Sequence, residues 1–304
     1  MDKRLRWFDE GAAALRRAFE RAGKVEELPL RGECYACPCC LGLYRRDAVA
    51  SRDLTIEDVP PKALGGRPML LTCKACNNEA GTKLDAHAAM QAVGDSLARG
   101  IDIGRSIKAT SFADGVPLRG EARMSNGSLL FTGIPEQNAP AALAQFEAAL
   151  AAYGSSNPGK GLSITVHTGF EDARARLSLI RAAYLAAFAG LGWTYVLQDT
   201  LRPVRQQLRA PEDQILKPYL FRDPSTPSSQ RSMLVVTDPP ELASVAVTLG
   251  EFALFLPGVW QGGTWEEIGL AFAGRAESDG RLEISLHGKT VPWPTSPTYF
   301  LDGE

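Results

Sequence analysis

Two Cys-x-x-Cys pairs near the amino terminus constrain this chain more than any other feature. The first pair is Cys37 and Cys40, and the second is Cys73 and Cys76. A gap of two residues forms a tight turn that directs both sulfurs at one ion, so two such pairs can complete a tetrahedral zinc site. Two disulfides are the alternative, but they require an oxidising compartment, and the charged, amphipathic segment 1–23 lacks the apolar core of a secretory signal. We therefore expect a structural Zn²⁺ ion in a cytoplasmic protein.

Two further cysteines leave the choice of the first pair open. Cys34 precedes Cys37 by the same spacing, so these two would also form such a turn. We prefer Cys37 and Cys40, because the apolar residues of 41–44 follow them like the second arm of a short zinc-ribbon hairpin. Cys34 and Cys39 are then free thiols, which commonly pack as small apolar side chains.

Three stretches around the second pair carry a further pattern. Residues 57–66 read Glu-Asp-Val-Pro-Pro-Lys-Ala-Leu-Gly-Gly, residues 71–81 contain the second pair followed by Asn-Asn, and residues 84–87 read Leu-Asp-Ala-His. Together with the first pair they resemble the HNH endonuclease family, in particular its bacterial branch with paired cysteines, over about residues 34–90. The resemblance implies a ββα-metal unit in which two strands, joined by the Pro- and Gly-rich loop, precede a helix. It also implies hydrolysis of phosphodiester bonds in DNA, or less readily RNA, in a bacterial setting such as defence.

The position of the family's general base is the main departure from this resemblance. The family has a histidine directly after the acidic residue, where this chain has Asp58. A histidine with an ordinary pKa near 6.5 accepts a proton at neutral pH, whereas an aspartate near 3.9 is a weak base. Carboxylates suit Mg²⁺ or Mn²⁺ instead, so Glu57 and Asp58 are predicted ligands of a catalytic metal. Adjacent strand residues point to opposite faces, so both reach one ion only if the chain bends before Pro60.

The helix expected after Cys76 supplies the other candidate catalytic residues. Asn77, Gly81 and Asp85 recur at a spacing of four, which places Asn77 and Asp85 on one stripe of a regular helix. Asp85 is therefore a predicted third metal ligand. The resemblance gives Asn77 the role of bracing the loop through hydrogen bonds to its backbone. His87 is the candidate for a relocated base, although its helical phase turns it away from that stripe.

Length and composition bound the rest of the chain. With 304 residues, 45% hydrophobic and 22% charged, the chain can form two domains with buried cores. We expect an α+β fold, with an N-terminal helix and the HNH-like zinc module in residues 1–100 and a larger α+β domain of unknown function in residues 101–304. The net charge of −2 requires any nucleic-acid surface to be local. No apolar run reaches the roughly 20 residues that a membrane span requires, so no membrane partner is expected.

Residues 101–304 alternate strand and helix signals. Asn126-Gly127 and Asp279-Gly280 predict two hairpins, the second between residues 268–273 and 281–287. Further strands are expected at 232–236, 245–249 and 252–256, and helices at 140–153 and 170–191.

Three arginines give the only basic stripe that we identify in this half. Arg202, Arg205 and Arg209 recur three and four residues apart in an expected helix. Such a stripe can bind backbone phosphates, although a solvated helix face has the same pattern. Two functions other than hydrolysis stay open. One is a zinc module that has lost catalysis and recognises nucleic acid or a protein partner, and the other is an inactive subunit completed by a partner or a second copy.

Overall fold

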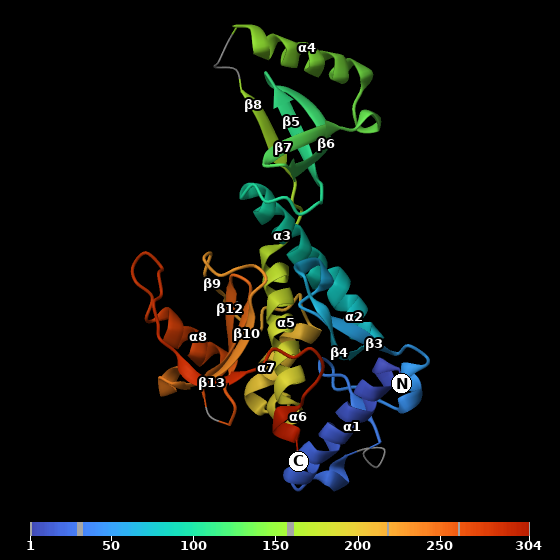
Figure 1. Cartoon of the computed structure of the whole chain (residues 1–304), viewed down its shortest axis with the longest axis vertical. Helices are drawn as coiled ribbons and strands as arrows, with labels where there is room; N and C mark the ends of the chain where they lie inside the picture. Colours follow the sequence, from blue (N-terminus) through green and yellow to red (C-terminus); the bar gives the residue numbers. More distant parts are fainter. Residues whose placement is uncertain (1, 29–32, 157–160, 218, 261, 304) are drawn as a thin grey trace. The chain divides into compact units, whose positions relative to one another are not determined.

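The chain divides into two compact units (Figure 1). The structure is a computed structural model that describes residues 2–28, 33–156, 161–217, 219–260 and 262–303. Residues 1–86 join residues 173–304 in the first unit, and residues 87–172 form the second, inserted unit. Both contain helices and antiparallel sheets, so the predicted α+β class is confirmed. The division differs from the predicted boundary near residue 100, because the helix that follows the insertion packs against the zinc module.

The first unit begins with the predicted N-terminal helix, α1 (Lys3–Arg21), which buries Trp7 and Leu15. The zinc module, residues 34–85, follows. Its elements are β1 (Tyr35–Ala36), β2 (Leu43–Tyr44), β3 (Leu54–Val59), β4 (Arg67–Cys73), α2 (Lys74–Ala80) and a π-helical turn, η5 (Gly81–Asp85). The strands form two antiparallel pairs, β1 with β2 and β3 with β4. The order of β3, β4 and α2 is the one that a ββα unit requires.

Helix α5 (Asp172–Leu191) is central to the first unit (Figure 1). Its side chains are buried on all sides over most of its length, as expected for a helix surrounded by protein. One apolar cluster joins it to the zinc module, through residues such as Leu71, and to a five-stranded sheet, through residues such as Val247. The zinc module therefore shares its core with the second half of the chain.

The five-stranded antiparallel sheet has the strand order β13-β10-β11-β12-β9. Its strands are β9 (Phe221–Arg222), β10 (Arg231–Asp238), β11 (Ser244–Leu249), β12 (Phe252–Pro257) and β13 (His287–Val291), and the helices of this half are α6 (Trp193–Val196), α7 (Arg202–Arg209) and α8 (Trp265–Ala273). The predicted strands in 232–256 are confirmed. The second predicted hairpin is wrong, because residues 268–273 lie in α8, which begins at a Thr264 capping box, while β13 pairs with β10.

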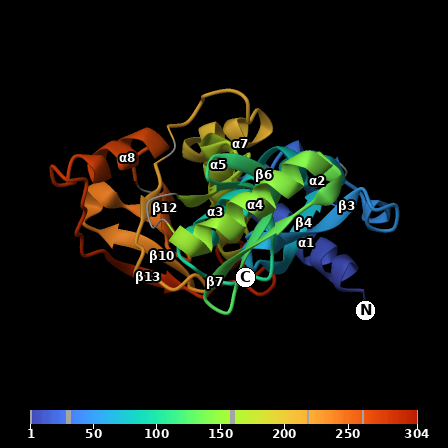
Figure 2. The ribbon, with the colours of Figure 1, turned by 90° about the horizontal axis from the view of Figure 1, so that it is seen from above.

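The inserted unit is built on a four-stranded antiparallel sheet of order β7-β6-β5-β8. Its elements are α3 (Ala86–Ala98), β5 (Ile107–Ala113), β6 (Val116–Ser125), β7 (Ser128–Gly133), α4 (Pro140–Ser156) and β8 (Leu162–Val166). Helix α4 lies across β5 and β6 (Figure 2). Asn126 and Gly127 have φ of 50° and 76° and form the predicted hairpin turn between β6 and β7.

Candidate functional site

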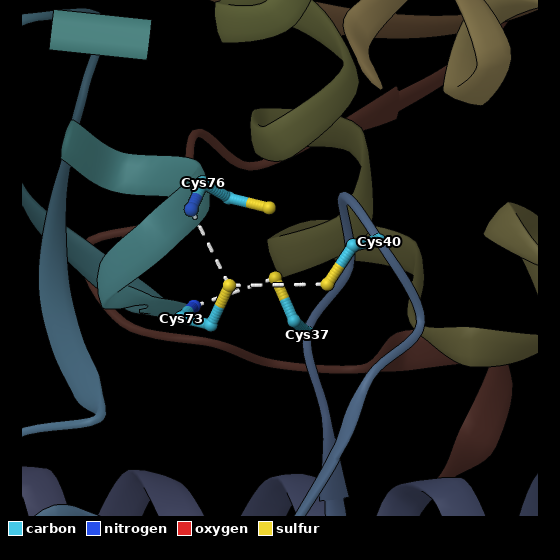
Figure 3. A group of neighbouring side chains, drawn as sticks. All are labelled: Cys37, Cys40, Cys73 and Cys76. Carbon is cyan, nitrogen blue, oxygen red and sulfur yellow. Dashed lines mark hydrogen bonds between the residues drawn. The ribbon is translucent and has the colours of Figure 1, made fainter. Parts of the chain in front are cut away.

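Four cysteines converge at the base of the zinc module (Figure 3). Cys37 and Cys40 lie in the turn after β1, Cys73 ends β4, and Cys76 lies in the first turn of α2. Their sulfurs all lie within 4.8 Å of one another, and those of Cys40 and Cys73 are 3.8 Å apart. Two sulfurs at 2.3 Å from one zinc ion in a tetrahedron are about 3.8 Å apart, so the donor set fits Zn²⁺. The predicted cysteine cluster is confirmed, and these residues can hold a metal ion.

Backbone amides and neighbouring thiols support this cluster. The amide of Cys73 donates to Sγ of Cys37, and the amide of Cys76 donates to Sγ of Cys73, both at 3.4 Å. Hydrogen bonding among the cysteines lowers the pKa of the Cys73 thiol, through Cys37 first, and raises the pKa of the Cys37, Cys40 and Cys76 thiols, so without a metal ion the negative charge of this cluster gathers on Cys73. A thiolate is the form that binds zinc. The preference for Cys37 and Cys40 over Cys34 agrees with the structure, in which Cys34 is a buried residue outside the cluster.

Glu57 has a partner that the sequence analysis did not anticipate. Its side chain is buried on β3, where the two oxygens accept hydrogen bonds at 2.9 and 2.7 Å from the guanidinium of Arg181 in α5. Oγ1 of Thr72 donates a third, at 2.8 Å. Burial is the largest effect on the pKa of Arg181 and lowers it, but Glu57, Cys39 and Asp85 together raise it above its ordinary value, so the guanidinium stays charged. Glu57 therefore has a guanidinium as its cation in this structure.

Asp85 faces the same guanidinium. Its oxygens lie 4.0 Å from Nη1 of Arg181 and 2.6 Å from the hydroxyl of Ser178, also in α5. Burial raises the pKa of Asp85, against the opposing effects of Arg181 and Ser178. The π-helical turn η5, which ends at Asp85, interrupts the regular helical period on which the predicted stripe with Asn77 depended. The predicted metal ligands Glu57 and Asp85 are thus brought together, around an arginine.

Asn77 and Asp58 occupy the positions that the resemblance assigns to the brace and the base. Nδ2 of Asn77 donates to the carbonyl of Ile56 at 3.1 Å and to Oγ1 of Thr55 at 3.0 Å, so it ties α2 to β3. The pairing of β3 with β4 shifts between Glu57 and Asp58, which is the bend that the sequence analysis required. Even so, Glu57 is buried and Asp58 is half-buried. Among the described residues, the cysteine cluster is the one group of three or more metal-binding side chains, and Asp58 is not part of it.

His87 lies in the inserted unit. Its Nδ1 accepts a hydrogen bond from the backbone amide of Glu171 at 2.9 Å, which links the beginning of that unit to its end. Because Nδ1 accepts this hydrogen bond, the neutral ring carries its proton on Nε2. The lone pair with which His87 would accept a proton as a relocated base is therefore already engaged.

The predicted arginine stripe on α7 is interrupted. Arg205 is buried and donates to the carbonyl oxygens of Val196 and Gln198, so it stabilises the preceding turn and cannot contact a phosphate. Arg202 and Arg209 are exposed at the two ends of the helix. The prediction of a continuous basic surface is wrong, because the central arginine of the three packs into the protein. A spacing of three and four residues fits a buried helix face as well as an exposed one.

A cavity of about 320 Å³ lies beside the cysteine cluster. Its lining includes Cys40, Cys76, Tyr44, Arg181 and Arg209. The cluster therefore borders a cavity whose lining is partly polar.

Arg181, Thr72 and Ser178 are the site residues that sequence reasoning missed. One signal for Arg181 was present, since it is the one charged residue in the run 177–191, which is apolar apart from Ser178 and the hydroxyl of Tyr184. A charge in such a run is seldom fully buried without a partner.

No family model, curated protein or solved structure matches this chain. None of the helices in the described part of the chain is long and apolar enough to cross a membrane.

Proposed function

We propose that this chain is a nucleic-acid-binding protein that uses a zinc-stabilised, HNH-like module as a scaffold and does not hydrolyse its ligand. The observation that carries the proposal is the guanidinium of Arg181, which is hydrogen-bonded to both oxygens of Glu57 and lies 4.0 Å from Asp85. A divalent cation bound to these carboxylates would lie beside a buried positive charge, and charges of like sign repel strongly where water is excluded. The base position holds Asp58, and an aspartate is a weaker general base than the histidine of the HNH family.

The β3–β4 hairpin offers a surface for the nucleic acid. Lys62 and Arg67 are exposed on it, Lys74 is exposed directly after it at the start of α2, and no acidic residue occurs from Val59 to Cys76. None of the ion pairs between described residues includes these three cations. Phosphate oxygens can therefore approach them without displacing a carboxylate. The zinc ion would fix the hairpin at its base, through Cys73 and Cys76.

The binding test compares two triple variants of the full chain. Lys62→Glu, Arg67→Glu and Lys74→Glu together should weaken binding to a fluorescent DNA duplex and reduce the slope of log Kd on log salt by up to about three units, since each phosphate contact contributes about 0.9. Lys24→Glu, Lys217→Glu and Arg281→Glu change the net charge equally at exposed positions elsewhere in the first unit. An equal effect of both variants would mean that only the total charge matters, and absence of binding by the wild type would refute the proposal.

Slow metal-dependent hydrolysis is the second candidate. Asp58 favours it, because this carboxylate is half-buried on the strand that Asn77 braces and shares no ion pair with the described residues. If the site hydrolyses DNA, Asp58→His should increase cleavage in Mg²⁺ or Mn²⁺ by about 10² or more, the usual contribution of a general base, and Asp58→Ala should abolish it. Gel assays on single- and double-stranded DNA and on RNA, each with an EDTA control, measure this. Cleavage by the wild type above that control would replace the first proposal with this one.

A further inference from the structure

The sheet of the inserted unit has one covered and one open face. Alternate residues of β5 and β6, such as Ile107, Ala109 and Ala122, are buried in clusters with side chains from α3. Ala113 and Leu118 are buried in a second cluster with side chains from α4. Both helices therefore cover the same face, and the residues between these positions point to the other side.

Cations are concentrated on the open face. Lys108 on β5 and Arg119 and Arg123 on β6 are exposed and alternate with the buried residues. They make up three of the six lysines and arginines in residues 87–172, whereas only one of the eight acidic residues there, Glu121, lies on this face. The unit as a whole has more acids than bases, so their distribution is uneven, and the open face is the basic one.

These side chains are free to bind an anion. No ion pair among the described residues includes Lys108, Arg119 or Arg123. Glu121, opposite Lys108 in the pairing of β5 and β6, accepts a hydrogen bond from Ser106 at 2.5 Å. Arg119 and Arg123 are four residues apart on one strand, which separates their Cα atoms by about 14 Å at 3.4 Å per residue.

We infer that this open face binds double-stranded DNA, with the β6–β7 ribbon directed into the major groove. The groove is about 12 Å wide and admits a two-stranded ribbon, and arginine side chains on such a ribbon can reach guanine edges or the flanking phosphates. Double-stranded RNA fits less well, because its major groove is too narrow for side chains to read. Single-stranded RNA is recognised mainly by stacking on two or three aromatic rings. Among the described residues, the rings on this face are Phe112, which is half-buried, and His167, whose ring is hydrogen-bonded to Thr110.

This surface goes beyond the proposed function, because none of its residues belongs to the zinc module. It gives the chain a second DNA contact, in a separate unit from the β3–β4 hairpin. The two contacts can therefore be tested independently.

The test uses the full chain and a fluorescent 20-base-pair duplex, read by anisotropy at several salt concentrations. Replacing Lys108, Arg119 and Arg123 together by glutamine should raise Kd at least tenfold and reduce the salt slope by up to about three units. Arg105→Gln removes an exposed cation of the same unit from the loop before β5 and should change Kd less than twofold. Glu121→Gln removes the acid from the face and should lower Kd, a gain that misfolding cannot imitate.

Three outcomes separate this inference from the proposed function. Unchanged Kd in both the triple glutamine variant and Glu121→Gln would overturn the inference, while loss of binding in the hairpin variant would still support the proposed function. If the triple glutamine variant loses affinity for the duplex while the hairpin variant binds normally, the result would support the inference and overturn the hairpin surface of the proposed function. A glutamine variant that loses affinity for single-stranded RNA but not for the duplex would overturn the choice of ligand.

Discussion

The zinc module and the inserted unit are similar in content and differ in what stabilises them. Each contains an antiparallel hairpin packed with a helix. In the insert, β5, β6 and β7 pair with their neighbours in sequence, and α3 and α4 cover one face of the resulting sheet. In the zinc module, two short strand pairs depend on four cysteines and on α5, which follows about a hundred residues later. In the insert, β8 completes the sheet from within the same unit by pairing with β5. The strand pairs of the zinc module instead pack around cysteines that can hold a metal ion and against a distant helix.

Loss of zinc should have the largest effect and should separate the two units. Structural zinc contributes on the order of 10 kcal/mol or more to a small domain, so Cys73→Ser or a strong chelator should unfold the zinc module. The insert contains none of the cysteines and should retain its protected amides. Hydrogen exchange read peptide by peptide measures both units at once, which a single unfolding curve of a two-unit chain does not.

Cys39→Ala and Cys34→Ala are the matched controls for this prediction. Both residues are buried in the same module and neither is one of the four clustered cysteines. Cys39 hydrogen-bonds Cys37 and Cys76, so Cys34 is the stricter control. Both variants should retain one zinc ion per chain by elemental analysis. If either variant loses zinc, or if the insert unfolds together with the module, the contrast between the units is wrong.

Breaking the Glu57–Arg181 pair should have the next largest effect. Arg181→Met leaves a carboxylate buried without its cation, which typically costs about 3–5 kcal/mol. Adding Glu57→Gln should recover much of this loss, because no uncompensated charge remains at Glu57. Arg46→Met is the matched control, since Arg46 also binds a carboxylate through two nitrogens, at 2.8 and 3.0 Å from Asp9, but on the surface. That variant should cost much less than Arg181→Met, because water solvates both members of an exposed pair when it is broken. Equal losses at the two positions would contradict the importance of the buried pair.

The same contrast explains how much of the structure could be predicted. The four-cysteine cluster, the Asn126-Gly127 hairpin and most strands of the second half follow from local spacing and turn chemistry, which the sequence displays directly. The partner of Glu57 could not be predicted, because Arg181 is 124 residues away and is brought to β3 only by packing of α5. Two local expectations also failed. The π-helical turn at Gly81–Asp85 altered the expected helical phase, and the apolar run 268–273 is short enough to fit either a strand or a helix.

Replacing Asp85 should have the smallest effect on the free energy of unfolding, and the size of that effect should depend on pH. Burial raises its pKa above the ordinary 3.8, so the folded chain holds this proton at a pH where the unfolded chain has released it. The contribution of Asp85 to stability is therefore fully present below pH 3.8 and is lost as the pH rises through the raised, folded-state pKa. Asp85→Asn has no proton to release, and its amide oxygen can still accept the hydrogen bond from Ser178. The variant should gain stability relative to the wild type as the pH rises across that window, by at most about 1.4 kcal/mol per pH unit.

The wild type and Asp85→Asn should both lose zinc at low pH. The difference between their free energies of unfolding, measured at each pH, cancels this shared effect. Above the window the difference should become constant, since Asp85 is then ionised in the folded and the unfolded chain alike. Arg181 limits its size, because the guanidinium at 4.0 Å offsets part of the cost of burying that charge. A variant that instead loses stability as the pH rises would mean that attraction to Arg181 exceeds the effect of burial. Asp85 would then be a full member of the ion pair that Glu57 forms.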